Sequence, residues 1–451
     1  RFRLCPKSGQ AVMPRYATLI VPILVNAAYW TSTQSLGPIL PVFAEKEGIP
    51  TIVVNLILTA PLVAVAVLSP LLGAKSKSYG PRIMIIVGLS IVTLSTALVP
   101  VAFGLSTHST LSFVVSLLLL RSLCSFGYAM SSPNIYVIFN AYFPNDVTWC
   151  SAVLEFCAGL AISGGGIVTG WLFAYVNISA PFIVWSSVGI SGIALCYLLI
   201  PSRDLFFTSA DVTGTAESAD TAIISPSSCR TMKARTMSQE QVGIRAHLKH
   251  PMILALLCVP AINEGAFQAV NCALELIFAE SFPRPSAPAG TVIGLAGMTM
   301  AAVTLMAGKI SKVCGPVVFT ALGSLLTCAM MLLMAWVQHV GKHMAIIISS
   351  AASVLAGAGM CAANVPIVEA LMLSSTGRDE DNVGPLGGLY MAAVSIGGLL
   401  GPMIVAASGA TGTGFDAFAL ATAATAAAIT FAIQAFAGRM PAAGTYSELP
   451  G

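Results

Sequence analysis

The sequence predicts an all-α membrane protein made of two similar six-helix halves, and three observations support this fold class. Of its 451 residues, 56% are hydrophobic and only 9% are charged, whereas about 25% charged residues are usual in soluble domains. Twelve apolar stretches are each long enough to cross a bilayer as a helix, which takes about 20 residues. One pattern, Gly-x-x-Ser-Lys-x-x-Gly-Pro, occurs twice about half a chain apart, as expected of a duplicated fold.

The twelve predicted spans divide evenly between the halves. In the first half they cover 16–42, 51–73, 83–104, 110–139, 149–173 and 180–201. In the second half they cover 251–279, 290–308, 317–339, 343–372, 386–409 and 413–437. We therefore expect two pseudo-symmetric bundles, at 1–201 and 251–451, joined by a cytoplasmic linker at 202–250. The first part of this linker is rich in Ser, Thr and Ala, which is typical of disordered segments, and residues 237–250 are compatible with a short surface helix.

The distribution of Lys and Arg predicts the orientation in the membrane. With the N-terminus in the cytoplasm, seventeen of the 21 Lys and Arg residues fall on the cytoplasmic side, only Lys46, Arg284 and Lys342 fall on the other, and Arg121 lies inside a span. Because positive charge concentrates on the cytoplasmic side of membrane proteins, both termini are predicted to be cytoplasmic. The sequon at Asn177 falls on the opposite side, so Asn177 is a predicted glycosylation site. The membrane is expected to be that of an intracellular vesicle or organelle, or the plasma membrane.

The duplicated pattern predicts a tight cytoplasmic turn in each half. Its glycines permit close helix approach and unusual backbone angles, and its proline cannot continue the preceding helix. The positions that define the two turns are Gly73, Lys77, Gly80 and Pro81, then Gly308, Lys312, Gly315 and Pro316. We expect these residues to be structural and not catalytic.

Ionisable residues inside the spans are few, and each is a functional candidate because a charge at mid-membrane costs about 2.5–3.5 kcal/mol. They are Arg121, Glu155, Glu264, Glu275 and Glu369. The seventh span carries the clearest pattern, a polar stripe at helical spacing on one face. Its members are Glu264, Gln268, Asn271 and Glu275. Such a stripe lines a water-filled path or pairs with a neighbouring helix, and we favour the path.

The chemistry of these residues suggests an exchange of protons for cations. A carboxyl that is neutral when no cation is bound and charged when it faces a cation suits this exchange. Glu275 and Glu155 are the first candidates. Arg121 has two open interpretations: a ligand on the path, or a buried partner for Glu155 or for carbonyls at a helix end. Asn26 and Tyr29 of the first span complete the predicted path. Cation–π contacts could come from aromatic residues, although ordinary packing explains any one of them: Tyr29, Trp30, Tyr128 and Tyr390.

Small residues recur at matching places in the fifth and eleventh spans, at 161–166 and 393–402, where the second stretch ends in Gly401 and Pro402. Small residues let membrane helices pack closely. With the duplicated turn, these stretches resemble motifs of the major facilitator superfamily. Three further segments are similar to its vesicular amine transporters, in particular the polyamine type: 36–48, 155–160, and 388–402.

The resemblance implies the twelve-helix major facilitator fold and import of organic cations in exchange for protons by alternating access. By position it places Arg121, Glu155 and Glu275 at polar sites inside the membrane. The chain departs from the family at the first turn, where Lys77 and Ser78 replace an Asp-Arg pair, and at Asn271, which replaces an acid. We therefore do not infer the identity of the substrate from the family.

The leading hypothesis is proton-coupled antiport of an organic cation or amine. One alternative is a facilitator or symporter of a neutral or anionic metabolite, with Arg121 binding the substrate; another is a non-transporting membrane receptor or scaffold. The sequence has no nucleotide-binding loop, metal-ligand spacing or nucleophile–base pair, so we expect no enzyme activity, cofactor or metal. A net charge of +3 does not indicate a nucleic-acid partner. The expected partners are a small-molecule substrate, protons and the lipid bilayer, and the expected state is a monomer.

Overall fold

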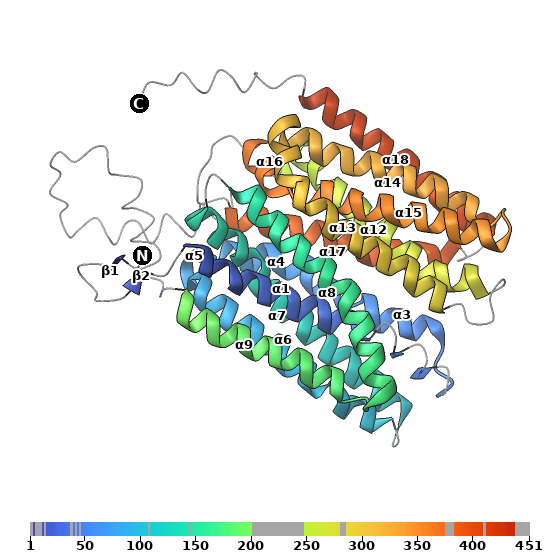
Figure 1. Ribbon diagram of the computed structural model, residues 1–451, viewed down its shortest axis with the longest axis horizontal. Coiled ribbons are helices and arrows are strands. Elements are labelled where there is room, and N and C mark those ends of the chain that lie inside the picture. The colour runs from blue at the N-terminus through green and yellow to red at the C-terminus, as the bar shows by residue number, and fades with distance from the viewer. Residues whose placement is uncertain are drawn as a thin grey trace.

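The computed structural model is a bundle of long helices that run in a common direction (Figure 1). It describes residues 3–4, 11–12, 15–36, 39–40, 43–44, 47–106, 109–143, 146–200, 248–279, 286–374, 383–408 and 412–437. Most of the predicted linker, and with it most of the expected surface helix at 237–250, lies outside these residues.

The first half begins with a short antiparallel pair, β1 (Arg3–Leu4) and β2 (Ala11–Val12). Helices follow in the order η1 (Arg15–Leu19), α1 (Ile20–Gln34), α3 (Thr51–Thr59), α4 (Leu62–Ala74), α5 (Ser76–Tyr79), α6 (Pro81–Leu105), α7 (Thr110–Tyr142), α8 (Val147–Tyr175) and α9 (Ala180–Leu199).

The second half continues with α12 (Pro251–Ala279), α13 (Ser286–Cys314), α14 (Pro316–Val337), α15 (Lys342–Asn364), α16 (Ile367–Ser374), α17 (Val383–Ser408) and α18 (Thr413–Ala437). Each half therefore presents the described helices in the order that the apolar stretches predict.

The predicted all-helical membrane fold is confirmed. Within the described residues, eleven helical segments are long and apolar enough to cross a membrane. The predicted first span is the one outside this set, because α1 has only 15 residues and follows the five residues of η1. The seventh and twelfth predicted spans, 251–279 and 413–437, coincide with α12 and α18.

Two predicted spans are interrupted in the structure. The second is divided into α3 and α4 at Pro61, and the tenth is divided into α15 and α16 at Pro366. Proline has no N–H to donate, and its ring clashes with the carbonyl four residues earlier, so it favours such breaks. Pro133 and Pro260, in contrast, lie inside the continuous helices α7 and α12.

The two predicted turns have the same backbone conformation at their second glycine. Gly80 has φ 82° and ψ 144°, and Gly315 has φ 85° and ψ 147°. Positive φ angles of this kind are available to glycine at little cost. Pro81 and Pro316 then start α6 and α14, where a missing N–H leaves no bond unmade. Both turns lie at the same end of the bundle, which we call the turn side.

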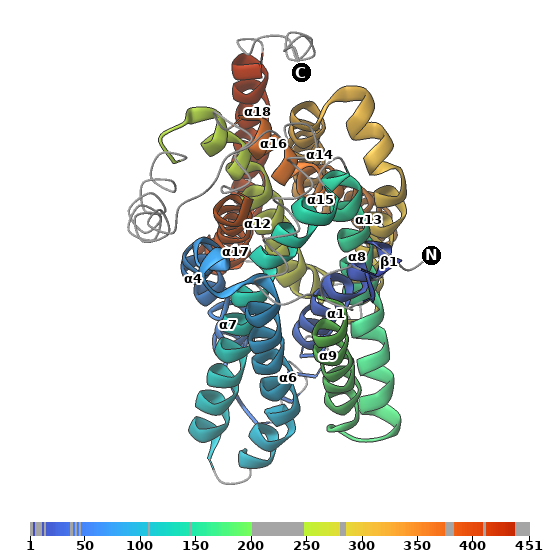
Figure 2. The same ribbon diagram turned by 90° about the vertical axis from the view of Figure 1, so that its left-hand side faces the viewer.

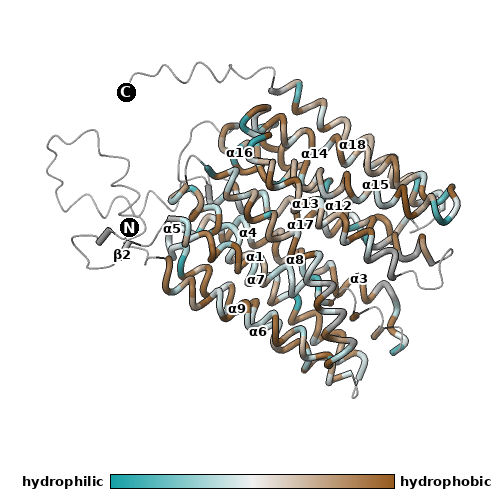
Figure 3. Tube along the Cα trace, in the orientation of Figure 1, coloured by the Kyte–Doolittle hydropathy of each residue, from teal (hydrophilic) through white to brown (hydrophobic). Residues whose placement is uncertain are grey.

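Contacts between helices are extensive both within and between the halves. In the turned view of Figure 2, helices of the first half occupy mainly the lower part and helices of the second half mainly the upper part. The halves meet along two seams, one between α4 and α17 and the other between α8 and α13. Many large apolar side chains on the outside are exposed, as a lipid-facing surface requires. Figure 3 shows the predominance of hydrophobic residues along the helices.

The α4–α17 seam is tight at the turn side. A Cβ atom added at Gly73 would lie 2.5 Å from the backbone oxygen of Gly384. At the matching position of the second turn, a Cβ at Gly308 would lie 3.9 Å from Trp149 of α8, an ordinary contact. An added methyl group at this motif position would therefore clash with backbone in one seam and make an ordinary contact in the other.

Candidate functional site

A cavity of about 30 Å³ lies between the two halves. We call it the central cavity. Its described lining comes from α1, α7 and α8 of the first half and from α12, α13, α15 and α17 of the second. The lining residues are Asn26, Trp30, Tyr128, Tyr136, Leu154, Glu155, Ala158, Ile162, Glu264, Met300, Met360, Asn364, Tyr390, Met391 and Val394.

Glu155 is the carboxylate that the first half contributes to the cavity. It lies on α8 with 9% of its surface exposed. The Tyr390 hydroxyl, from α17, donates a hydrogen bond of 3.4 Å to its Oε1 atom. On the other side, the Asn26 amide donates to the carbonyl of Leu154 at 3.1 Å and so ties α1 to this turn of α8. Glu155 thus sits on a positioned backbone and faces a partner from the other half.

Glu264 is the carboxylate that the second half contributes. It is 6% exposed, and its Oε1 atom accepts a hydrogen bond of 2.7 Å from Gln268, one turn later on α12. Asn271 is half-buried on the same helix. Glu275 also lies on α12, but its side chain is outside the described part of the structure. Among the described side chains of the predicted stripe, that of Glu264 lines the central cavity.

Aromatic rings form much of the cavity wall. Tyr29 and Tyr128 are stacked, with ring centroids 3.6 Å apart, and Trp30 meets the edge of Tyr29 at 5.4 Å. The Tyr128 hydroxyl donates to Asn26 at 3.1 Å. The predicted path residue Asn26 therefore lines the cavity, whereas Tyr29 is packed behind Tyr128 and supports its ring.

Arg121 lies away from the cavity lining. It is 3% exposed, and its Nη1 atom donates to the Thr33 hydroxyl at 3.4 Å. Its Nε atom has no hydrogen-bond partner among the described residues. Among these residues, no ion pair joins Arg121 to Glu155, the partner that one interpretation of the sequence gave it.

The side chains that line the cavity determine which charge it favours. Two carboxylates and four aromatic rings line it, and its described lining contains no Lys, Arg or His. Carboxylates attract a cation, and aromatic faces add cation–π attraction when the cation is desolvated. Within the described residues, no group of three or more His, Cys, Asp or Glu side chains could hold a metal ion.

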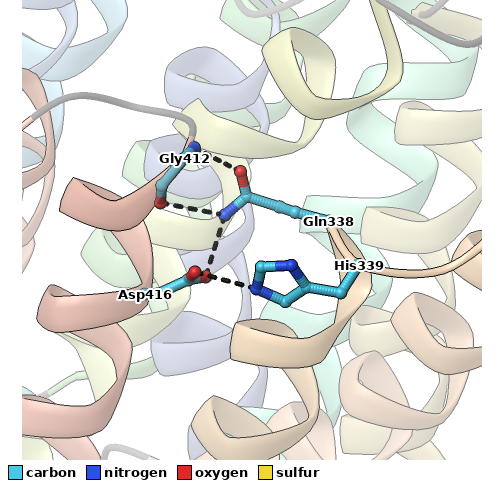
Figure 4. Close-up of polar contacts among 4 residues, drawn as sticks. All are labelled: Gln338, His339, Gly412 and Asp416. Carbon is cyan, nitrogen blue, oxygen red and sulfur yellow. Dashed lines mark hydrogen bonds and ion pairs between the residues drawn. The ribbon is translucent and has the colours of Figure 1, made fainter.

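A second polar cluster lies at the end of the bundle opposite the turn side (Figure 4). His339 Nε2 lies 2.9 Å from Asp416 Oδ2, and Gln338 donates to Asp416 Oδ1 at 3.1 Å. The Gln338 side chain also accepts a hydrogen bond from the Gly412 N–H. These contacts join the end of α14 to the start of α18, and neither helix lines the central cavity. The cluster therefore stabilises the packing of α14 against α18 within the second half.

Several lining residues were not predicted from the sequence: Tyr136, Asn364, Met300, Met360 and Met391. Nothing in the sequence distinguishes these methionines from the many other apolar residues of the chain. Asn364 could have been identified from the sequence, because a lone amide two residues before Pro366 marks a polar position at a helix break.

Comparisons with known proteins agree with this architecture. The model of the Major Facilitator Superfamily matches residues 23–402, so the resemblance to this superfamily is confirmed, while the vesicular amine branch stays a prediction. Among solved structures, the chain is similar to the human organic anion transporter MFSD10 (TETRAN), with a TM-score of 0.64 and 17% identity over 93% of this chain and 100% of that one. At this identity the similarity shows the fold alone. Among curated proteins, none matches the sequence significantly.

Proposed function

We propose that this chain, which belongs to the major facilitator superfamily, carries an organic cation across its membrane in exchange for protons. Membership, established by the match over residues 23–402, makes it a multi-pass membrane transporter of a small molecule and not an enzyme. The cationic substrate and the proton coupling are the proposal, and the resemblance to vesicular amine transporters supports both.

The charge of the central cavity is the observation that carries this proposal. Glu155 and Glu264 bring two carboxylates into a space whose described lining has no basic side chain. An anion placed there would meet like charges without compensation, and an isolated charge in a low-dielectric site is strongly disfavoured. A cation would instead gain both carboxylates and the faces of Trp30 and Tyr128.

Proton exchange follows from the position of Glu155. A buried carboxylate without a cation is costly, and protonation removes that cost. When an organic cation arrives, the charged carboxylate becomes the better partner and the proton leaves. Because the two ligands compete for one carboxyl, each crossing of the membrane carries the cation or the proton.

Alternating access supplies the movement. We propose that residues 1–201 and 251–451 act as two lobes that rock about the central cavity, which lies between helices of both. The seams α4–α17 and α8–α13 would open on one side of the membrane at a time.

We propose that the turn side is cytoplasmic, because the sequence segments predicted to be on the same side as the two turns carry the excess of Lys and Arg. Asn177 then faces the lumen or the exterior. It is exposed between α8 and α9, and its Oδ1 atom accepts hydrogen bonds from the N–H groups of Ser179 and Ala180. Expression in a glycosylating host should give a gel band that deglycosylation shifts and that Asn177→Gln removes. An unshifted band would contradict this orientation.

One observation favours a second candidate, a carrier of organic anions. Arg121 is a buried cation with an unpartnered Nε atom, and it would bind an anion if a conformational change brought it into the path. The similar human structure is that of an organic anion transporter. In the described structure, however, Arg121 does not line the central cavity.

The deciding experiment is uptake into liposomes with an acidic interior. Labelled spermidine, serotonin and acetylcholine serve as cations, and p-aminohippurate serves as the anion. We expect uptake of at least one amine that collapses when the pH gradient is dissipated and that is lost in Glu155→Gln. Arg121→Gln and Glu275→Gln are measured alongside.

The outcomes separate the candidates. Uptake of the anion alone, with loss in Arg121→Gln, would replace the proposal by the anion carrier. Amine uptake that ignores the pH gradient would refute proton coupling but keep the cationic substrate. Liposomes that hold their gradient and take up neither class would contradict both.

A further inference from the structure

The tenth span is broken at the central cavity. Helix α15 ends at Asn364, α16 begins at Ile367, and Pro366 stands in the gap between them. The chain around the break is buried, with Val365 and Ile367 almost fully covered. Irregular backbone at membrane depth is tolerated where it is buried in protein or lines a cavity, and in transporters such breaks often coordinate ions.

Asn364 is the polar side chain at this break. It is 7% exposed and lines the central cavity together with Glu155 and Tyr390. Its Oδ1 atom accepts no hydrogen bond from any described residue. A buried carbonyl oxygen without a donor costs about 1–3 kcal/mol, so a ligand that satisfies it would bind with a corresponding gain.

The end of α15 adds negative potential at the same place. The last carbonyls of a helix have no partner within it, and the helix dipole gives its C-terminus a partial negative charge. Pro366 reinforces this effect, because it has no N–H to donate to the carbonyl of Ala362, four residues earlier. The Asn364 amide oxygen, the helix end and the Glu155 carboxylate thus all favour positive charge.

We propose that the break at Asn364–Pro366 is a binding subsite for a monovalent cation, with the Asn364 amide oxygen as a ligand and Glu155 in the lining of the same cavity. This inference rests on the proposed cationic substrate for one of its two sources: the cation is a protonated amino group of the transported molecule, or a free sodium ion. A cavity of about 30 Å³ holds one group of this size, since a bound water needs about 10–15 Å³ by the same measure. A hard oxygen set of this kind suits either source.

The subsite gives Asn364 a role that differs from that of Glu155. An amide does not titrate, so its attraction for a cation is present whether Glu155 is charged or neutral. Asn364 would contact the cation as it arrives and displaces the proton from Glu155. It is therefore a ligand for the cation and not a proton carrier.

The test is thermal stability of the purified full-length protein, titrated separately with sodium chloride and with the amine that gives uptake, or spermidine if none does. N-methylglucamine chloride is the ionic-strength control. Asn364→Leu keeps the branched shape and the number of side-chain heavy atoms but removes the acceptor, and Asn364→Asp keeps an acceptor oxygen. Ser349→Ala removes a buried, unpartnered hydroxyl from the same helix α15 at a position outside the cavity lining, as a control for folding.

We expect a cation to raise the melting temperature of wild type, Ser349→Ala and Asn364→Asp. In Asn364→Leu the concentration needed for the same shift should rise about tenfold or more. A response to sodium identifies a free alkali ion, and a response to the amine alone identifies the amino group of the substrate.

An unchanged response of Asn364→Leu, or no response of the wild type to either cation, would overturn the subsite. Failure of the proposed function is distinguishable: if no amine is transported, sodium stabilisation still tests the subsite. If amine transport persists with unchanged affinity in Asn364→Leu, the subsite alone fails. Should Asn364→Leu not fold, Asn364→Asp decides, because an added negative charge at a cation subsite must change the concentration dependence.

Discussion

The two buried carboxylates of the central cavity come from different halves of the chain and are held in different ways. Glu155 accepts its hydrogen bond from Tyr390, across the boundary between the halves. Glu264 accepts its bond from Gln268, on its own helix. A movement of the halves must change the environment of Glu155, whereas the Glu264–Gln268 pair can move as a unit. We therefore assign proton coupling to Glu155 and attraction of the cation to Glu264.

The largest predicted effect is that of Glu155→Gln. Loss of a residue that transfers a proton typically reduces a rate by 10²–10⁴, so uptake driven by a pH gradient should fall by about 100-fold or more. Exchange of labelled for unlabelled substrate, without a gradient, should persist because Glu264 still attracts the cation.

Glu264→Gln is the matched comparison for this prediction. It should lower apparent affinity in both assays and leave the dependence on the gradient intact. Equal loss of coupling in the two variants would remove the distinction between the carboxylates.

The halves also differ at the duplicated turn, and Gly73→Ala should give the next largest effect. Its methyl group would collide with the Gly384 backbone in the α4–α17 seam, and overpacking of this kind costs about 1–3 kcal/mol. We expect the transport rate to fall about tenfold, because the turn side closes less readily.

Gly308→Ala makes the same chemical change in the second turn. Its nearest neighbours are atoms of Trp149 at 3.9 Å, so the transport rate should stay within about twofold of wild type. Similar losses in both variants would show that helix propensity, and not seam contact, controls the effect. Thermal stability of each purified variant separates slow transport from poor folding.

Tyr390→Phe tests the bond between the halves directly. At 3.4 Å the bond is long, and a typical net contribution is about 1 kcal/mol, so the ratio of protons exchanged per substrate should change while uptake falls only about fivefold. Tyr29→Phe is the control, because Tyr29 lies behind Tyr128 and does not line the cavity. A loss of coupling in Tyr29→Phe but not in Tyr390→Phe would contradict the assignment.

The smallest predicted effect concerns the ion pair between Lys312 and Asp146, which links the second turn to the start of α8 at 3.7 Å. Both side chains are largely exposed, and exposed pairs contribute at most about 1 kcal/mol. Lys312→Ala should therefore change the transport rate by less than about fivefold, with a smaller change at high salt. A loss as large as that of Gly73→Ala would show that charge, and not backbone packing, closes this side.

Much of the fold could be predicted because the length of an apolar stretch determines whether it can cross the membrane as a helix. The breaks could not, since Pro61 and Pro366 interrupt helices whereas Pro133 and Pro260 do not, and the difference depends on how neighbouring helices satisfy the freed backbone groups. The duplicated glycines were predictable for a local reason, since their positive φ angles are a property of the turn itself.

The candidate site could be predicted only in part. The cost of charge in lipid singled out Glu155 and Glu264, but it singled out Arg121 equally, and only packing places Arg121 beside Thr33 and away from the cavity. The contact between Glu155 and Tyr390 joins residues from different halves, so no local pattern contains it. Asn364 was passed over because an uncharged amide carries little cost on its own.

The most direct test of the account is proton release on substrate binding, measured in weakly buffered detergent solution with purified protein. We predict that adding the transported amine releases protons from wild type and from Glu264→Gln, and that Glu155→Gln releases none although it still binds the amine. Release from Glu155→Gln equal to that of wild type would contradict the claim that the cation and the proton compete for Glu155.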